Sequence, residues 1–171
     1  MAEAGKQDAV ALLKQDHRTV EDLFEKFEKA SGEGRKQKLA EEICLELSVH
    51  AMIEEEIFYP ACEGKIEEDL LKEAYVEHDG AKVLIAQLLE GDGQSDEYFD
   101  AKVKVLQEQI EHHVEEEEQG PKSLFGQARK TDVDLKALGE QLAERKKELM
   151  AEMKASGVPQ PELTTMDGVQ L

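Results

Sequence analysis

The chain has 171 residues and a formal net charge of −19, and only 5% of its residues are aromatic. This length suits one domain with a sizeable core, and the abundance of Glu, Leu, Lys and Ala favours an all-α fold. The charge argues against binding to nucleic acid or to an anionic membrane, because phosphates would be repelled.

Clusters of Gly, Pro and small polar residues divide most of the chain into four segments. These clusters are ASGEG (30–34), PACEG (60–64), GDGQS (91–95) and the region from Gly120 to Gly126. In each segment, selected residues recur at alternating spacings of three and four. Such spacing places them on one face of a helix, the face that a bundle buries.

The predicted core face of each segment contains a histidine. In the first segment the face comprises Val10, Leu13, His17, Val20, Phe24 and Phe27. In the second it comprises Ile43, Leu47, His50, Glu54 and Ile57. In the third it comprises Leu71, Ala74, His78, Ala81, Ile85 and Leu88, and in the fourth Phe99, Val103, Leu106, Ile110, His113 and Glu117.

The short connections imply antiparallel neighbours, so we expect an up-down-up-down four-helix bundle over residues 8–130. An additional C-terminal helix is expected within 131–156. It has an apolar side formed by Leu135, Leu138, Leu142 and Leu149. This helix either docks on the bundle or mediates self-association. Residues 157–171 include two prolines and have weak periodicity, which predicts a flexible tail.

Several features favour a cytoplasmic protein. No apolar run approaches the roughly 20 residues needed to cross a bilayer, and MAEAGKQDAV lacks the apolar core of a signal peptide. Cys44 and Cys62 are too few for a disulfide framework and form no CxxC pair, so both are expected to be reduced.

The polar residues on the predicted core faces need an explanation. A buried carboxylate without a partner costs several kcal/mol, so such residues are normally paired or bound to metal. A single histidine on an apolar face is usually an ordinary core residue with a hydrogen-bond partner. Four of them, with Glu54 and Glu117 four residues after His50 and His113, are harder to explain in that way.

The turn positions place the four histidines at one height. In an antiparallel hairpin, two residues equally far from the turn lie at the same level. The midpoint between His17 and His50 falls inside ASGEG, that between His50 and His78 at Gly64, and that between His78 and His113 at the end of GDGQS. The two glutamates lie one turn further, about 6 Å along their parallel helices, and can meet across the bundle axis.

The pattern also repeats, since the second histidine of each hairpin opens an HxxxE sequence. A duplicated hairpin would build two equivalent metal positions, each with two imidazoles, that share two carboxylates. Imidazole suits iron, zinc or copper, while bridging carboxylates favour iron or manganese. The sequence therefore predicts a dinuclear site formed by His17, His50, Glu54, His78, His113 and Glu117.

The stretch HHVEEEEQG contains both site residues and surface residues. His113 and Glu117 lie on the core face, whereas His112 is turned about 100° away and is expected to be peripheral. The remaining acidic residues of the two HxxxE regions are interpreted as solvated surface: Glu55, Glu56, Glu115, Glu116 and Glu118.

Four segments together resemble the hemerythrin-like HHE cation-binding domain family: KQDHRTVEDLF, HAMIEEEIFYP, VEHDGAKVL and HHVEEEE. The resemblance covers residues 8 to 122, and LGEQLAERKKELM is similar to the extra helix of many bacterial members. It implies a non-haem di-iron centre with the four histidines as terminal ligands. Glu54 and Glu117 would bridge the irons, with an oxo or hydroxo group completing the core. Manganese is the alternative metal.

The sequence departs from the oxygen-carrying hemerythrins, which have a fifth ligand histidine in an HxxxH and an aspartate bridge. Here the positions four residues either side of His78 are Ala74 and Lys82, and the last bridging position is a glutamate. This resembles the four-histidine, two-glutamate branch of the family, and the resemblance implies reaction with oxidants and not reversible oxygen carriage. Tyr75, three residues before His78, either faces the cluster or packs with its hydroxyl toward the surface.

The leading functional hypothesis is a di-iron protein that binds or reacts with dioxygen, peroxide or nitric oxide, as a binder, sensor or scavenger. Enzymatic activity is undecided. The alternatives are a catalase-like enzyme that decomposes peroxide and a protein for iron delivery or iron-centre repair. A structural module without metal is a further reading, but His–Glu pairs would leave His17 and His78 unexplained. A monomer and a small homo-oligomer are both compatible with the sequence.

Overall fold

The computed structural model describes residues 7–91, 93 and 95–167, and it is entirely helical in its regular structure over these ranges. The four long bundle helices are α1 (Ala9–Lys29), α2 (Glu33–Ile53), α4 (Glu68–Glu90) and α5 (Phe99–Glu118). A π-helical turn η1 (Glu54–Phe58) and a short helix α3 (Tyr59–Cys62) extend α2. Helices α6 (Leu124–Ala128) and α7 (Leu135–Ser156) follow the bundle. Among the described helices, none combines the length and apolarity that a membrane crossing requires.

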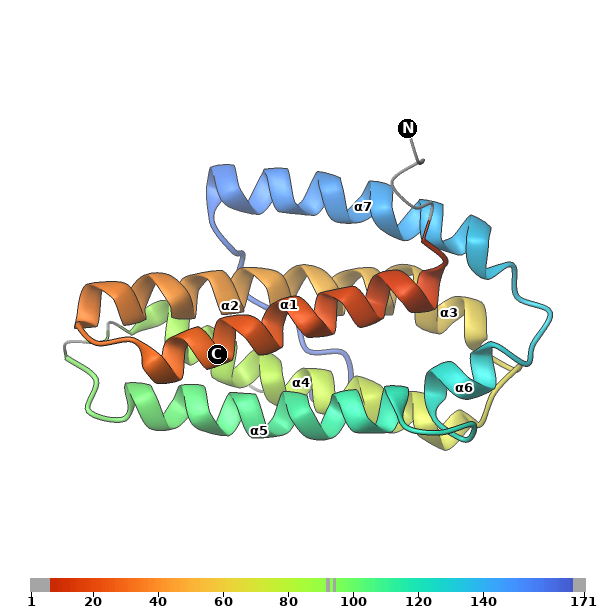
Figure 1. Cartoon of the computed structure of the whole chain (residues 1–171), viewed down its shortest axis with the longest axis horizontal. Helices are drawn as coiled ribbons and strands as arrows, with labels where there is room; N and C mark the ends of the chain where they lie inside the picture. The colour runs from red at the N-terminus through yellow and green to blue at the C-terminus, as the bar shows by residue number, and fades with distance from the viewer. Residues whose placement is uncertain (1–6, 92, 94, 168–171) are drawn as a thin grey trace.

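The four long helices form a closed antiparallel ring. Helix α1 packs against α2, α2 against α4, α4 against α5, and α5 against α1. Helix α7 lies along α1 and α2 on the outside of this ring, at the top of Figure 1. The predicted four-helix bundle with an additional C-terminal helix is therefore confirmed. Of the two roles predicted for that helix, docking on the bundle is the one seen.

Local sequence features fix the contact between α1 and α7. Asp8 begins α1, and its Oδ1 accepts a hydrogen bond from the backbone N–H of Ala11 at 2.8 Å, which satisfies one free donor of the first turn. Gly139 of α7 touches this same helix start. A Cβ atom at position 139 would lie 2.2 Å from the backbone oxygen of Gln7, so only glycine permits this approach.

The predicted core faces are buried with one exception. Ile57 is only partly buried, and the neighbouring Phe58 is fully buried in its place. The physical reason is η1, in which the backbone N–H of Tyr59 bonds to the carbonyl of Glu54, five residues earlier. This wider turn changes which side chains face the core. Pro60, which was predicted to lie in a loop, is part of helix α3.

The buried apolar residues form two clusters. One includes Leu13 of α1, Phe58, Phe125 and residues of α7, and the other includes Val20 of α1 and most of the bundle beyond it. His17 lies between Leu13 and Val20 in the sequence, and the polar residues form a layer at this level. The polar layer is enclosed by apolar packing on both sides, so its charges are shielded from water.

The segment after α7 returns to the bundle and lies against α4. The backbone N–H groups of Thr164 and Thr165 donate hydrogen bonds to the Asp79 carboxylate at 2.9 and 2.6 Å. Lys82 donates to the carbonyl oxygen of Glu162 at 3.0 Å. These contacts give the segment a defined position over α4. The flexibility expected for residues 157–171 stays a prediction, and 168–171 lie outside the described residues.

Candidate metal centre

The four core histidines meet at one level of the bundle, one from each long helix. They are His17 on α1, His50 on α2, His78 on α4 and His113 on α5, and all four are buried. The Nε2 atoms of the first two lie 3.2 Å apart, and those of the last two are also 3.2 Å apart. The structure thus brings the predicted imidazoles together as two pairs.

Glu54 and Glu117 are also buried, and each reaches both pairs. Glu54 Oε1 lies 3.0 Å from the Nε2 atom of His50 and 3.3 Å from that of His78. Glu117 Oε1 lies 3.2 Å from one Nε2 atom of each pair, those of His17 and His113. The six residues form two sets, within each of which the potential ligand atoms lie within 4.8 Å of one another: His17, His50, Glu117 and Glu54, His78, His113. Each glutamate therefore lies between the two histidine pairs.

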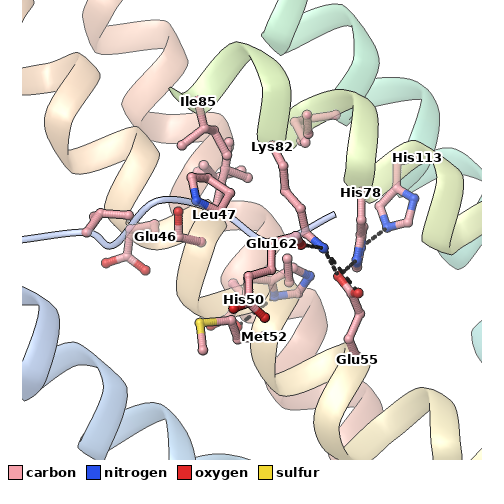
Figure 2. Close-up of a pocket in the computed structure, with 18 of the residues that line it drawn as sticks. Glu46, Leu47, His50, Met52, Glu55, His78, Lys82, Ile85, His113 and Glu162 are labelled. Atoms are coloured by element: carbon pink, nitrogen blue, oxygen red, sulfur yellow. Dashed lines mark hydrogen bonds and ion pairs between the residues drawn. The ribbon is translucent and has the colours of Figure 1, made fainter. Parts of the chain in front are cut away.

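Each imidazole turns its other ring nitrogen, Nδ1, toward a carboxylate outside the six. The acceptors are Glu118 for His17 at 2.5 Å, Asp16 for His50 at 2.8 Å, Glu55 for His78 at 3.0 Å and Glu77 for His113 at 2.9 Å. Figure 2 shows the bond between His78 and Glu55. An ionised carboxylate only accepts hydrogen bonds, so each Nδ1 must donate a proton. In the neutral ring the lone pair is then on Nε2, inside the cluster.

The centre of the cluster consequently has many electron pairs and few protons. Both oxygens of Glu54 and Oε1 of Glu117 have no hydrogen-bond donor among the described residues. Each Nε2 atom lies within 3.3 Å of Glu54 Oε1 or Glu117 Oε1, but a neutral imidazole bonded through Nδ1–H offers these oxygens only a lone pair. A buried anion without a partner is strongly unfavourable. The residues present therefore fit a bound cation.

Protonation of the imidazoles is the other way to supply positive charge. Burial lowers the pKa of His50, but the carboxylates of Glu54 and Asp16 outweigh this effect and raise the pKa to about 10. However, the Nε2 atoms within each pair are only 3.2 Å apart, which leaves room for one proton and not for two. Metal ions would satisfy all four nitrogens together. Nitrogen and oxygen donors of this kind suit first-row transition metals.

Tyr59 is a part of the centre that the sequence analysis missed. Its hydroxyl is fully buried and donates to Glu117 Oε2 at 2.8 Å. Burial and the charges of Glu117 and Glu54 raise its pKa well above the usual value, so the phenol keeps its proton. In a regular α-helix, Tyr59 would lie about 140° around the axis from Glu54, five residues earlier. The turn η1 brings the two onto one face.

The carboxylates that accept from Nδ1 were also missed, and two predictions are corrected. Glu55 and Glu118, which were interpreted as solvated surface, are partly buried and hold His78 and His17. Both have cationic partners, Lys82 for Glu55 at 3.0 Å and Arg18 for Glu118 at 2.6 Å. The only signal in the sequence was position, because each of the two directly follows a predicted ligand.

His112 and Tyr75 both lie outside the cluster. His112 has 63% of its side chain exposed, with Nε2 3.1 Å from Glu116 and 3.4 Å from Glu77. The Tyr75 ring packs edge-on against Tyr59, with ring centres 5.2 Å apart. Tyr75 thus supports the tyrosine that reaches the centre. Ala74 and Lys82 occupy the two positions at which a second histidine would complete an HxxxH with His78. Ala74 is a buried core residue, and Lys82 is the ion-pair partner of Glu55.

Comparison with protein families shows which family the chain belongs to. The family model for the hemerythrin HHE cation-binding domain matches residues 8–123. The chain belongs to the hemerythrin HHE family. The matched region of the HHE domain extends from the residue before α1 to the residue before α6. It therefore contains the four core histidines together with Glu54 and Glu117.

A structural comparison extends the similarity beyond the matched region. The HHE chain is similar to a crystal structure of a hemerythrin HHE cation-binding domain-containing protein from Mycobacterium kansasii, with a TM-score of 0.72 and 24% identity. The match covers 89% of this chain and 95% of that one. It shows that the fold is shared. The search of curated proteins found no match to the chain.

Proposed function

We propose that this HHE domain holds a non-haem di-iron centre at His17, His50, Glu54, His78, His113 and Glu117, and that it binds or reacts with a small oxidant. The candidate ligands are dioxygen, peroxide and nitric oxide, and the role is that of a binder, sensor or scavenger. The observation that carries the proposal is the position of the two glutamates, each of which contacts one histidine of both pairs.

The donor set supports iron, with manganese as the alternative metal. Imidazole together with bridging carboxylate is suited to iron or manganese, and sites of histidine and carboxylate with open positions are typical of iron proteins that use oxygen. In the proposed arrangement, the four imidazoles and the two glutamates would together hold both metals, and the positions that they do not occupy would be open to a small ligand. Bound iron would supply redox chemistry, and the protein would hold the ligands in place and exclude bulk water.

Metal analysis is the first test of this proposal. Protein purified after growth with added iron should contain two iron ions per chain, and manganese should not displace them when both metals are supplied. Rapid anaerobic mixing of the reduced protein with dioxygen, peroxide or nitric oxide should then change the visible spectrum. Protein that folds normally but takes up neither iron nor manganese would contradict the proposal.

A catalase-like activity is the second candidate, and Tyr59 favours it. The buried hydroxyl lies 3.3 Å from His78 Nε2 and 3.4 Å from His113 Nε2, at the edge of the donor set. By turning from Glu117, it can donate a hydrogen bond to a peroxide bound there. Conversion of two hydrogen peroxide molecules to dioxygen and two waters is measured directly with an oxygen electrode. Iron-loaded protein that evolves no dioxygen from peroxide would exclude this candidate.

The cysteines support a cytoplasmic location as part of the same proposal. Cys44 and Cys62 are both free and buried. Burial, aided by Glu41, raises the pKa of Cys44 to about 12, so this thiol stays protonated and unreactive at neutral pH. Neither residue is one of the six proposed ligands. A reducing compartment would preserve both thiols.

A further inference from the structure

A cavity of about 470 Å³ adjoins the candidate metal centre. Its lining includes His50 and Ala51 of α2, His78 and Lys82 of α4, and the segment after α7 (Figure 2). A water molecule takes up about 30 Å³ in the liquid, so the volume of this cavity is many times larger than the volume of a two-atom ligand. Pockets for organic molecules begin at about 300 Å³.

The walls of the cavity are largely apolar, and the proposed metal ligands lie together at one part of it. The apolar lining from the four bundle helices includes Val20, Leu47, Ile85, Ile110 and Val114. The lining also contains all four histidines of the metal centre. Such a surface fits a molecule with an apolar body and one polar end that reaches the metal.

The charges around the cavity argue against an anionic ligand. Lys82, the lysine among the described lining residues, is already paired with Glu55 at 3.0 Å and with Asp79 at 3.3 Å. Glu46 and Glu162 add further negative charge to the wall. Away from the metal centre, a carboxylate or phosphate would meet repulsion, and the lining residues that the structure describes include no unpaired lysine or arginine to offset it. A neutral molecule avoids this cost.

Two small side chains help to keep the space open. Ala51 of α2 and Ala81 of α4 both line the cavity, and Ala81 lies one turn after His78. A leucine at either position would add three carbon atoms to the lining. The remaining wall comes from the segment after α7, including Val158, Pro161 and Leu163. Its contacts with Asp79 hold it there.

We propose that this cavity binds a neutral, apolar organic molecule with one oxygen-bearing end, such as the hydroxyl of an alcohol or the terminal group of an organic hydroperoxide, directed at the metal centre. The body of the ligand occupies the space between α2 and α4. The role of the oxygen-bearing end rests on the proposed metal function. The site would select for organic ligands in addition to diatomic ones.

Binding can be measured without iron or an oxidant. The full-length protein, metal-free and loaded with redox-inactive zinc, is titrated with the neutral fluorescent probe N-phenyl-1-naphthylamine. We expect saturable binding of one probe per chain and its displacement by 2-phenyl-2-propanol. The alcohol should compete more strongly in the zinc-loaded protein, because its hydroxyl then has a metal to contact. Absence of saturable binding in both forms would overturn the proposal.

Variants test the location of the probe. Ala81→Leu would fill space that the probe needs, so it should weaken probe binding about tenfold or more. Ala101→Leu, on the exposed surface of α5, is the matched control and should bind as the parent does. Circular dichroism melting checks that each variant is folded. If Ala81→Leu does not fold, Ala51→Leu decides the question. Unchanged affinity in a folded cavity variant would overturn the assignment.

The two proposals can fail separately. Loss of the organic-ligand site would leave iron uptake and reaction with dioxygen or peroxide intact. Failure to bind iron would leave probe binding to the metal-free protein intact, and would remove only the stronger competition by the alcohol in the presence of metal.

Discussion

Each core histidine uses its two ring nitrogens for different tasks. Nδ1 donates to an outer carboxylate, and Nε2 faces the centre. The outer hydrogen bond fixes the ring orientation and makes Nε2 a better donor to a metal. The six inner residues alone would form a loosely held cluster. The four outer carboxylates hold the imidazoles in fixed orientations. Three of these carboxylates form an ion pair with a lysine or arginine.

Glu54 is the inner residue whose charge matters most directly. Replacement by glutamine keeps the shape of the side chain but removes the negative charge and one of the two equivalent oxygens that a bridge requires. We expect Glu54→Gln to reduce the iron content from two ions per chain to one or fewer. Metal analysis after gel filtration measures this.

Glu56→Gln is the matched control for that experiment. Glu56 lies two residues later, is exposed, and pairs with Arg145 at 2.9 Å. This variant should keep the iron content of the parent protein. Equal iron content in both variants would show that Glu54 does not bridge the metals.

Tyr59 should contribute to both stability and spectrum. Tyr59→Phe removes the donor to Glu117 and leaves a buried carboxylate oxygen without its partner. Such a loss typically costs about 1–3 kcal/mol, so the free energy of unfolding in urea should fall by about that amount. The visible spectrum of the iron-loaded protein should shift, because Glu117 then loses a hydrogen bond.

Tyr75→Phe separates this effect from general loss of a hydroxyl. The Tyr75 ring packs against Tyr59, 5.2 Å between ring centres, and its side chain lies outside the cluster. The Tyr75→Phe variant should leave the visible spectrum unchanged and lower the free energy of unfolding by less than Tyr59→Phe does. If the two variants behave alike, the Tyr59 hydroxyl has no particular role at the centre.

At the level of elements, α7 is connected to the metal centre through a chain of contacts. Lys146 of α7 contacts Asp16 Oδ1 at 2.5 Å, and Asp16 Oδ2 accepts the Nδ1–H of His50 at 2.8 Å. The helix outside the ring therefore positions a proposed ligand inside it. Loss of the direct partner of a ligand histidine, here Asp16, typically weakens metal affinity about 10–100-fold, and Lys146 acts one contact further out.

Lys146→Met should consequently lower iron affinity by about tenfold. Competition with a chelator of known affinity measures the change. Lys147→Met, at the exposed next position of the same helix, removes an equal charge without touching Asp16 and should retain the parent affinity. A decrease of the same size in both variants would point to net charge and not to the contact with Asp16.

The elements also show how far the sequence could predict this protein. Alternating spacings located the core faces of the four long helices, and symmetric turn positions placed His17 and His78 at one level. Ile57 was placed wrongly on the core face and Tyr59 was not predicted, because a π-helical turn changes the angle per residue around the helix axis. Residue type alone does not reveal such a turn. The roles of Glu55 and Glu118 were not predicted because the sequence is rich in glutamate. Residue type alone does not distinguish the glutamates that accept a hydrogen bond from a core histidine.

For the whole molecule, metal binding should act as a crosslink. One histidine comes from each of α1, α2, α4 and α5, so a loaded centre would tie together all four helices between the two apolar clusters. A ligand that binds the folded state and not the unfolded chain stabilises the fold. The chain also has a net charge of −19, and bound cations would reduce its internal repulsion.

The stabilisation of the fold by bound metal should increase with pH. In the metal-free protein, burial lowers the pKa of His50, but Glu54 and Asp16 outweigh it and raise the pKa to about 10. A group whose pKa is raised in the folded state stabilises the fold fully below its unfolded value, about 6.5 for histidine. That contribution is lost as the pH rises through the folded value. The metal-free protein should therefore weaken between about pH 6.5 and pH 10.

The metal-loaded protein should respond in the opposite direction, because ligand imidazoles must lose their protons before they bind metal, and higher pH favours this. The difference in Tm between the loaded and the metal-free protein should thus widen from about pH 6.5 to pH 9. Differential scanning calorimetry of both forms across this range measures it. A difference that stays constant or narrows would mean that protons and metal do not compete for these imidazoles, and hence that the histidine cluster is not where the metal binds.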